Sequence, residues 1–469
     1  MPNVARPPPP LPLDVLAHIV ALVVVPLPES PWGVEDPGAR RERYDDAYFD
    51  NYMRLHELGE LHGIKATENE AVFELLAGQR DLLAMSAVCK QWRAATVDLA
   101  RSTFVVANTH SFKTLPTLFT GRRGKNAPPP LHRPKKLVLV DNGWRDARRG
   151  PLFAKLVEAA AATLEEVELR LTGNPFGVRA EDPLGEPLRK ALAMVKGMKH
   201  FRIRADSSRS GVLMRYEQVL LLLEAWQALE TFDLPEILIH PAREEEWEWP
   251  PGRSPFPLPS RLSTLSLDIS YLDDLGSFTH LLIRYLDSDA VKHLRNLHLR
   301  GISASLSPRK GPALYRALTH AAPHLTNLTL ADPHHYTTNR RLPTHTDWTP
   351  LLRHLTSLRS AHLDLAIFNH GILLSSTFTS LSRLCTRSLR HLILDAGRCT
   401  FKFSLETEVS EEEMLGFLQS VYEGKVELGT RKGLKTLLFN GKTGKIWSEE
   451  GRRKMHELAG RARIELTLE

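Results

Sequence analysis

Apolar residues recur along most of the chain in a short pattern: an apolar residue, two others, an apolar residue, any residue, and a third apolar residue. The clearest copies begin at Leu262, Leu294, Leu325 and Leu389, and weaker or terminal copies begin at Arg101, Pro134, Leu164, Met198, Leu229, Leu358, Leu434 and Arg461. The residue between the last two apolar positions is mostly polar, as at Ser266, His298 and Thr329. Alternation with a period of two is typical of a half-buried strand, so each copy predicts one strand.

The period changes to that of a helix between the predicted strands. Apolar residues follow an i, i+3, i+4, i+7 spacing in 151–164, 216–229 and 313–325. Such a stripe predicts an amphipathic helix. Because the strand pattern returns at intervals of about 32 residues between Pro134 and Leu389, the chain is predicted to repeat a unit of one strand and one helix.

One strand and one helix cannot bury their apolar sides alone, whereas stacked copies share a continuous core. We therefore expect an α/β solenoid of about 10–12 repeats over 101–469, with parallel strands along one side and helices along the other. This arrangement resembles the leucine-rich repeat in an irregular, long form, which implies strands on the concave side and helices on the convex side. The asparagine that follows the strand in that family is present only at Asn142, and the equivalent places are held by Ser270, Ile302, Pro333 and Ala366. Ankyrin and tetratricopeptide arrays share the period but have no such strand.

The composition is that of a globular chain from a reducing compartment. Apolar residues make up 42% and charged residues 25% of the 469 residues. The three cysteines, Cys89, Cys385 and Cys399, are too few and too scattered for a disulfide framework or a zinc site. No apolar run reaches the about 20 residues of a membrane span, and the apolar stretch at 15–27 lacks a signal-peptide cleavage site. We expect a cytoplasmic or nuclear protein with no membrane partner.

The charge is distributed unevenly. The formal net charge is +6, yet residues 26–79 hold 12 Asp and Glu against 5 Lys and Arg, which is a local charge of −7. The remaining basic excess is modest and spread over some four hundred residues, without a stripe of basic and aromatic side chains. Nucleic acid is therefore not an expected partner.

The sequence contains no recognisable catalytic motif. The nearest approach to a phosphate-binding loop, at 441–445, has the wrong spacing. His334 and His335 are adjacent, so in an extended segment they would point to opposite sides, which is poor geometry for one metal ion. We expect no catalytic residues, no metal and no cofactor, and hence not an enzyme.

The first hundred residues differ from the repeats. A proline-rich tail at 1–10 is followed by Leu-Pro and an apolar helical stripe in 11–25, and the segment 81–96 predicts two short helices that close with Val-Cys-Lys-Gln-Trp-Arg. Together these segments resemble the F-box, which opens with Leu-Pro, an acidic residue and an apolar helix, and continues with Asp-Leu-Leu and Val-Cys-x-x-Trp-Arg. The matching residues are Leu11, Pro12, Asp14, Leu16, Ile19, Asp81, Leu82, Leu83, Val88, Cys89, Trp92 and Arg93.

The resemblance makes 11–100 an F-box-like helical domain with an acidic, aromatic insertion at 26–79, where the family has a short turn. The insertion could loop out from the helices or obstruct the surface that binds the adaptor. The alternative for 11–100 is a plain helical cap that covers the first repeat.

The F-box resemblance also implies a function, which is that of a substrate-recognition subunit in a Skp–cullin–F-box ubiquitin ligase. The F-box helices would lay apolar side chains on the Skp adaptor, and through it reach a cullin. The repeats would hold an unknown target protein and raise its effective concentration near a ubiquitin-charged enzyme. The candidates for adaptor binding are Leu11, Pro12, Val15, Leu16, Ile19, Leu82, Leu83 and Val88. The alternative function is a non-catalytic repeat scaffold with no link to a ubiquitin ligase.

Two kinds of position are candidates for target binding. The first is the outward face of the strands, at Glu166, Glu168, Arg170, Arg202, Arg204, Asp268, His298, Arg300, His362, Asp364 and Asp395. The second is a pair of loops with exposed aromatic and charged residues, at Trp247, Trp249, Tyr336, Arg340 and Arg341. The alternative interpretations are a solvated sheet face and loops that pack back on the repeats.

Overall fold

A computed structural model describes the strand–helix region of the chain and a few residues before it. The described residues are 84–85, 87–88, 90–93, 96, 102–106, 116, 119, 134–141, 149–171, 184–205, 212–240, 259–268, 277–300, 311–331, 348–368, 374–396, 409–429, 433–440 and 447–468. They fall into two compact units. The first contains the described residues up to Leu171 together with Leu184–Met198 and Ala205, and the second contains Lys199–Arg204 and the described residues from Val212 onward.

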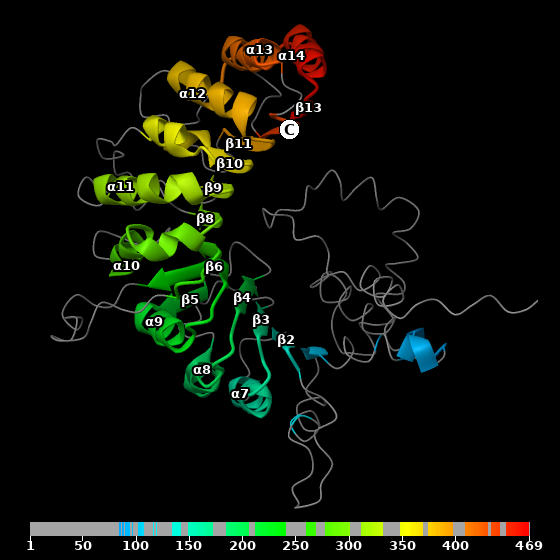
Figure 1. Cartoon of the computed structure of the whole chain (residues 1–469), viewed down its shortest axis with the longest axis vertical. Helices are drawn as coiled ribbons and strands as arrows, with labels where there is room; N and C mark the ends of the chain where they lie inside the picture. Colours follow the sequence, from blue (N-terminus) through cyan, green and yellow to red (C-terminus); the bar gives the residue numbers. More distant parts are fainter. Residues whose placement is uncertain are drawn as a thin grey trace, which may run out of the picture. The chain divides into compact units, whose positions relative to one another are not determined.

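The described repeats of the first unit contain a parallel sheet covered by the helices α7 (Arg149–Ala160) and α8 (Gly185–Ala193). Strands β1 (Thr103–Val106), β2 (Lys136–Asp141) and β3 (Glu166–Leu171) pair in that order, in parallel. Helices α7 and α8 pack against each other (Figure 1).

The second unit stacks the remaining repeats. Its strands are β4 (His200–Ala205), β5 (Val212–Arg215), β6 (Thr231–His240), β7 (Thr264–Asp268), β8 (Asn296–Arg300), β9 (Asn327–Ala331), β10 (Ser360–Asp364), β11 (His391–Asp395), β12 (Thr436–Asn440) and β13 (Glu465–Leu468). The order is β4-β6-β7-β8-β9-β10-β11-β12-β13, and β5 pairs with the far end of β6. Every pairing is parallel, which confirms the predicted α/β class with parallel strands.

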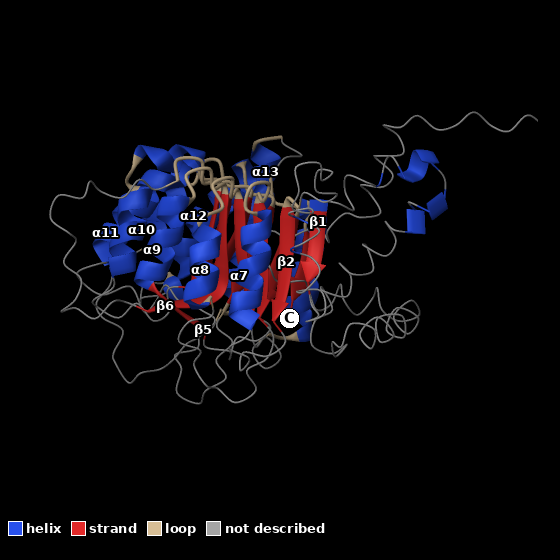
Figure 2. Cartoon of the chain, turned by 90° about the horizontal axis from the view of Figure 1, so that it is seen from below, coloured by secondary structure: helices blue, strands red, loops and turns tan. Residues whose placement is uncertain are grey.

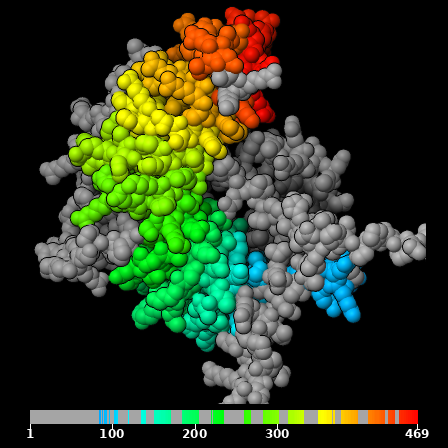
Figure 3. Space-filling view, in the orientation of Figure 1, coloured from blue at the N-terminus to red at the C-terminus, as the bar shows by residue number. Residues whose placement is uncertain are grey.

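Helices of the second unit cover one face of its sheet (Figures 1 and 2). They are α9 (Tyr216–Ala225), α10 (Ser277–Leu286), α11 (Gly311–Ala321), α12 (Leu374–Arg387), α13 (Glu411–Glu427) and α14 (Glu449–Ala462). Short 3₁₀ helices complete several repeats: η3 (Asp289–His293), η5 (Ala322–His324), η6 (Thr349–His354) and η7 (Leu365–Ile367). Successive repeats of this unit pack side by side in sequence order (Figure 3).

The core lies between the strands and the helices. The apolar positions of the predicted strand pattern are buried at Leu137, Leu139, Val167, Leu169, Phe201, Ile203, Phe232, Leu234, Leu265, Leu267, Leu297, Leu299, Leu328, Leu330, Ala361, Leu363, Leu392, Leu394, Leu437 and Phe439. Strand β8 shows the alternation, because Leu297 and Leu299 are buried while the residues around them are partly exposed. Each fully buried leucine contributes about 2 kcal/mol from its removal from water. The helical stripe of α11 is buried as well, at Leu314, Ala317, Leu318 and Ala321.

The helices end earlier than the apolar stripe predicts. The pattern of 313–325 continues to Leu325, but α11 ends at Ala321 and Leu325 is extended, with φ −74° and ψ 130°. The same leucine therefore belongs to the turn that starts the next strand, and it is buried there. A stripe of leucines cannot distinguish a helical from an extended backbone at this position, because both place the leucine side chain in the core.

Part of the predicted N-terminal domain lies among the described residues. Ala84, Met85, Ala87, Val88, Lys90–Arg93 and Thr96 are helical. The Thr96 hydroxyl donates a hydrogen bond to the Trp92 carbonyl at 2.8 Å, as expected within a helix. The tail 1–10, the segment 11–83 and the insertion 26–79 lie outside the described residues. Among the helices that the structure describes, none is long and apolar enough to cross a membrane.

Candidate functional site: the polar face of the parallel sheet

The sheet of the second unit turns a polar face away from its helices. On this face the strand register aligns side chains into rows. The first row holds His200, Thr231, Thr264, Asn296, Asn327, Ser360, His391 and Thr436. The middle row holds Arg202, Asp233, Ser266, His298, Thr329 and His362, and ends in Ile393 and Leu438. We call this surface the polar face.

Hydrogen bonds run along the first row from strand to strand. The Asn327 amide donates to the Asn296 side-chain oxygen at 2.5 Å, and the Asn296 amide donates to the Thr264 hydroxyl at 2.8 Å. Each asparagine therefore takes its orientation from its neighbour. Imidazole–hydroxyl pairs continue the row on both sides, His200 with Thr231 at 3.0 Å and His391 with Thr436 at 2.9 Å.

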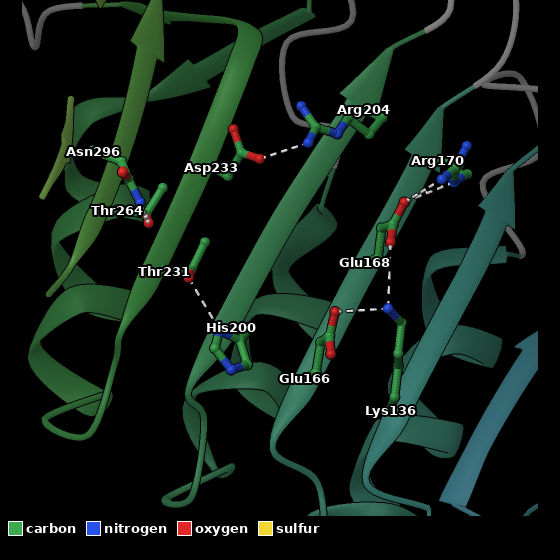
Figure 4. A network of polar contacts seen from close by, with 10 residues as sticks. All are labelled: Lys136, Glu166, Glu168, Arg170, His200, Arg204, Thr231, Asp233, Thr264 and Asn296. Carbon is green, nitrogen blue, oxygen red and sulfur yellow. Dashed lines mark hydrogen bonds and ion pairs between the residues drawn. The ribbon is translucent and has the colours of Figure 1, made fainter. Parts of the chain in front are cut away.

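A charged pair lies at one end of the polar face. The Arg204 guanidinium on β4 donates to the Asp233 carboxylate on β6 at 2.7 Å, with side-chain exposures of 29% and 12% (Figure 4). Arg202, on the same strand, lies beside Asp233 in the register. The partial burial of the carboxylate makes this pair a fixed feature of the surface rather than a fluctuating one.

His298 occupies the middle row near this pair. Its Nδ1 lies 2.8 Å from the Thr329 hydroxyl on the next strand. Burial lowers the pKa of His298 to about 4, although the Asp233 carboxylate acts in the opposite direction. The cations Arg300 and Arg204 lower this pKa further. The imidazole is therefore uncharged at neutral pH and offers one donor and one acceptor to its surroundings.

Arg300 is a further cation on the same strand. It is partly exposed and, within the part of the chain that the structure describes, forms no ion pair and no side-chain hydrogen bond. An arginine of this kind can receive a carboxylate or phosphate from a partner through its planar fork of donors. The Arg300 side chain is thus the group on the polar face that is best placed to bind an anion.

A second polar cluster joins β10, β11 and β12. The His362 Nε2 lies 2.5 Å from one Asp395 oxygen, and the Asn440 amide donates to the other at 2.8 Å. His362 is 8% exposed and its strand neighbour Asp364 is 3% exposed. These side chains fix the geometry of Asp395, which is the more exposed member of the cluster.

The first unit has a comparable network on β2 and β3. The Lys136 ammonium lies 2.8 Å from Glu166 and 4.0 Å from Glu168, whose carboxylate also binds Arg170 at 2.6 Å (Figure 4). Glu168 is 5% exposed, so its charge is compensated by cations on both sides.

The arrangement is suited to recognition. It presents alternating donors and acceptors, with isolated charges, over several neighbouring strands. Such a surface binds polar and charged groups of an extended partner by complementarity. Within the described residues, no group of three or more His, Cys, Asp and Glu side chains is placed to hold a metal ion.

The structure locates some of the predicted site residues and brings several together. Arg202, Arg204, His298, Arg300, His362 and Asp364 all lie on strands of the second unit. Four of them form one electrostatic neighbourhood, because Arg300, Arg204 and His362 each act on the pKa of His298. Val88 is helical and 68% exposed. The following predicted site residues lie outside the described residues: Leu11, Pro12, Val15, Leu16, Ile19, Leu82, Leu83, Trp247, Trp249, Tyr336, Arg340 and Arg341.

The asparagine row was not among the predicted site residues. Asn296 and Asn327 immediately precede the first inward leucine of their strands, and the same position holds Thr264, Ser360 and Thr436 in other repeats. The sequence places a polar, hydrogen-bonding residue at this position of every repeat, and this regularity indicates a row of such residues across the sheet.

Comparisons with known proteins do not identify a family for this chain. No protein-family model matches the chain, and no curated protein matches it.

Proposed function

We propose that the chain is a target-binding receptor subunit of a Skp–cullin–F-box ubiquitin ligase. In this proposal, the helical segment that ends in Val-Cys-Lys-Gln-Trp-Arg binds the Skp adaptor, and the polar face binds a target protein. We assign the repeats to an irregular class of leucine-rich repeat, because each unit contributes one parallel strand and one helical segment.

The exposure of Val88 is the observation that carries the adaptor half of the proposal. Val88 is 68% exposed, whereas Trp92, one helical turn further, is partly buried. A helix that served only to cover the first repeat would turn its apolar residues inward. An apolar side chain held in the open on this segment instead supports a surface that a partner covers.

The polar face supports the target half. Its rows of neutral hydrogen-bonding groups impose shape and register on a partner, and Arg300 adds a charge that can select an anionic group. The receptor performs no chemistry in this proposal. Its contribution is to hold the target close to a ubiquitin-charged enzyme, which raises the effective concentration of the target.

Binding of purified Skp adaptor to the full chain, measured by calorimetry, tests the adaptor half. Val88→Asp places a charge in the proposed contact and is expected to weaken binding at least about tenfold. The matched control is Met194→Asp, because Met194 is also an exposed apolar residue, at 56%, and lies outside the proposed contact. Equal affinity of all three proteins, or equal loss in both variants, would contradict the adaptor role and favour a repeat scaffold without a ligase link.

The target half is tested separately. Arg300→Glu is expected to remove one set of co-purifying proteins from the full chain while adaptor binding stays unchanged. Arg316→Glu, an equal charge change on the exposed side of α11, is the control. If the co-purifying proteins are the same for both variants and the parent, the polar face is not the target-binding surface.

A further inference from the structure

A row of exposed cations lies along the end of the second unit's sheet where helices lead into strands. Arg359, Arg390 and Lys435 immediately precede β10, β11 and β12, and all three side chains are exposed. The Arg390 N–H donates to the Arg359 carbonyl at 2.7 Å, and the Lys435 N–H donates to the Arg390 carbonyl at 2.7 Å. The three residues are therefore direct neighbours, about 4.8 Å apart from strand to strand.

Two further exposed cations stand at the same end of the unit. Arg353 lies in the last turn of η6 and Arg387 in the last turn of α12. Together with Arg359, Arg390 and Lys435 they form what we call the basic edge. It spans three consecutive repeats.

The cations of the basic edge have no ion-pair partner among the described residues. None of its five cations forms an ion pair there, and no Asp or Glu occurs in 349–363, 383–394 or 433–439. Elsewhere in the second unit a single cation is neutralised, as Lys292 is by Asp289 at 2.6 Å. The edge is thus a concentration of uncompensated positive charge.

Helix dipoles explain only part of this concentration. A cation in the last turn of a helix offsets the partial negative charge of the terminal carbonyls, and this accounts for Arg353 and Arg387. The helix dipole does not account for the cations that come after the helices, directly before the strands, where there are no terminal helix carbonyls to offset. These cations are Arg359, Arg390 and Lys435.

The protonation of a neighbouring histidine reflects the same charge. His391 follows Arg390 on β11, and its pKa is lowered first by burial and then by Lys435 and Arg390. Lys435 and Arg390, which precede two different strands, therefore both lie close enough to act on this imidazole.

Two exposed apolar residues lie at the end of the helix that precedes Lys435 in the chain. Val426 is 61% exposed and Leu428 is 53% exposed, at the end of α13. The Lys425 ammonium beside them donates to the Leu434 carbonyl at 2.6 Å, immediately before Lys435. Large apolar side chains this exposed are few among the described residues, and the Lys425 hydrogen bond ties this helix end to the residue before Lys435.

We propose that the basic edge docks a short acidic segment of a partner protein, with apolar side chains of that segment covering Val426 and Leu428. Charge complementarity supplies the attraction, and the apolar pair supplies a contact that a purely ionic ligand would leave open. The surface is separate from the polar face, and the proposal does not depend on a ubiquitin-ligase role.

The size of the edge favours a short segment over an extended polyanion. The cations directly before the strands extend over two strand spacings, or about 10 Å. Glu465 ends the row, since its N–H donates to the Lys435 carbonyl at 2.8 Å, and Glu427 lies between the two apolar residues. A bilayer surface or a nucleic acid duplex would extend past the row and bring its own negative charge against Glu465, whereas a short segment can end before it.

Fluorescence anisotropy with the full chain tests the proposal. The probe is a labelled synthetic peptide of glutamates with two central leucines, and a glutamine version of it serves as the uncharged comparison. The triple variant Arg359→Glu, Arg390→Glu, Lys435→Glu is expected to bind the acidic peptide about tenfold more weakly than the parent. The matched control is Lys155→Glu, Lys196→Glu, Arg316→Glu, which changes the net charge equally at exposed positions that do not belong to the basic edge.

Each alternative outcome has a defined meaning. An equal loss in the control variant would show that net charge alone attracts the peptide, and equal binding of the glutamine peptide would remove the ionic basis; either result overturns the proposal. The proposal is also overturned if phosphatidylserine vesicles or duplex DNA bind the parent more tightly than the peptide and depend on the same three cations.

A second variant, Val426→Ser with Leu428→Ser, changes only exposed side chains, so it tests the proposal even if the triple variant fails to fold. Unchanged affinity for the acidic peptide in this second variant contradicts the proposed contact.

Discussion

At the scale of single residues, the polar face keeps a histidine uncharged inside a neighbourhood of charges. His298 makes a cross-strand contact with Thr329 at 2.8 Å, and burial holds its pKa at about 4. In the unfolded chain the same ring titrates near 6.5. Between these two values the unfolded state binds more protons than the folded state, so stability rises with pH across this window and is lost as the pH falls.

We therefore predict that acidification from pH 7 to pH 4.5 destabilises the protein, with His298 contributing up to about 2 kcal/mol. His298→Asn keeps a polar group opposite Thr329 but does not titrate, so the free energy of unfolding should depend less on pH. Urea unfolding at the two pH values measures the difference.

The control for this prediction is His456→Asn, an exposed histidine on α14. It should leave the pH dependence as in the parent. If His298→Asn does the same, the ring does not contribute to the acid sensitivity of the fold.

A glycine provides the second test at this scale. Gly433 has φ +113°, and a Cβ built on it would lie 2.5 Å from the Cys385 carbonyl oxygen. Backbone atoms cannot move aside as a flexible side chain can, so Gly433→Ala is expected to cost about 3 kcal/mol of stability. Chemical denaturation of the variant and the parent gives the value.

Gly429 offers a matched comparison. Its φ is also positive, at +56°, but a Cβ there would have no neighbour within 4 Å. Gly429→Ala should therefore cost only about 1 kcal/mol, from the left-handed backbone alone. Equal effects of the two substitutions would show that the close approach to Cys385 is not what requires glycine at position 433.

At the scale of elements, the last two helices are fixed by their first turns. Ser410 begins α13 with a capping box, in which its hydroxyl accepts from the Glu413 N–H and the Glu413 carboxylate accepts from the Ser410 N–H. Ser448 begins α14 by accepting from the Gly451 N–H, and it also donates to Glu411 of α13 at 2.9 Å. One carboxylate thus connects the starts of two neighbouring helices.

Removal of the cap of α13 should be measurable. Ser410→Ala leaves the Glu413 N–H without its partner and is expected to lower the free energy of unfolding by about 1 kcal/mol. Ser420→Ala, in the exposed middle of the same helix, should be neutral or slightly stabilising because alanine is the better helix former. Thermal or urea unfolding of both variants measures these differences in the free energy of unfolding. An unchanged free energy of unfolding in Ser410→Ala would mean that tertiary packing alone positions the helix.

The elements also show which features the sequence could predict. The inward leucines of β8 and β9 were predictable because a period of two is a local property of the chain. The contact between His362 and Asp395 was not, because it joins residues 33 positions apart and depends on how the turns set the register. The strand-preceding position of Arg359 and Arg390 was visible in the sequence, but their alignment into one row again required that register.

At the scale of the whole molecule, stability in a stack of repeats is close to a sum of neighbour contacts. The terminal repeat of such a stack must therefore cover the last core side chains and also prevent the edge strand from pairing with another molecule. Among the described strands β13 pairs only with β12, and its Glu465 and Thr467 are exposed and polar. A polar, charged edge strand resists pairing with a second molecule.

Deletion of 447–469 removes α14, β13 and Trp447 together. Trp447 stacks on Phe439 with ring centroids 4.9 Å apart, and its indole N–H donates to the Val409 carbonyl at 2.9 Å. The deletion would uncover Phe439 and Leu437, which are buried in the full chain, and would leave unpaired the backbone groups of β12 that bind β13. We predict that the shortened protein associates through this edge, so light scattering after size exclusion should find species larger than the parent.

The control is Glu465→Lys with Thr467→Lys in the full chain, which retains a charged edge and should elute like the parent. A shortened protein that remains as monodisperse and as stable as the parent would show that the last repeat does not act as the cap of the stack.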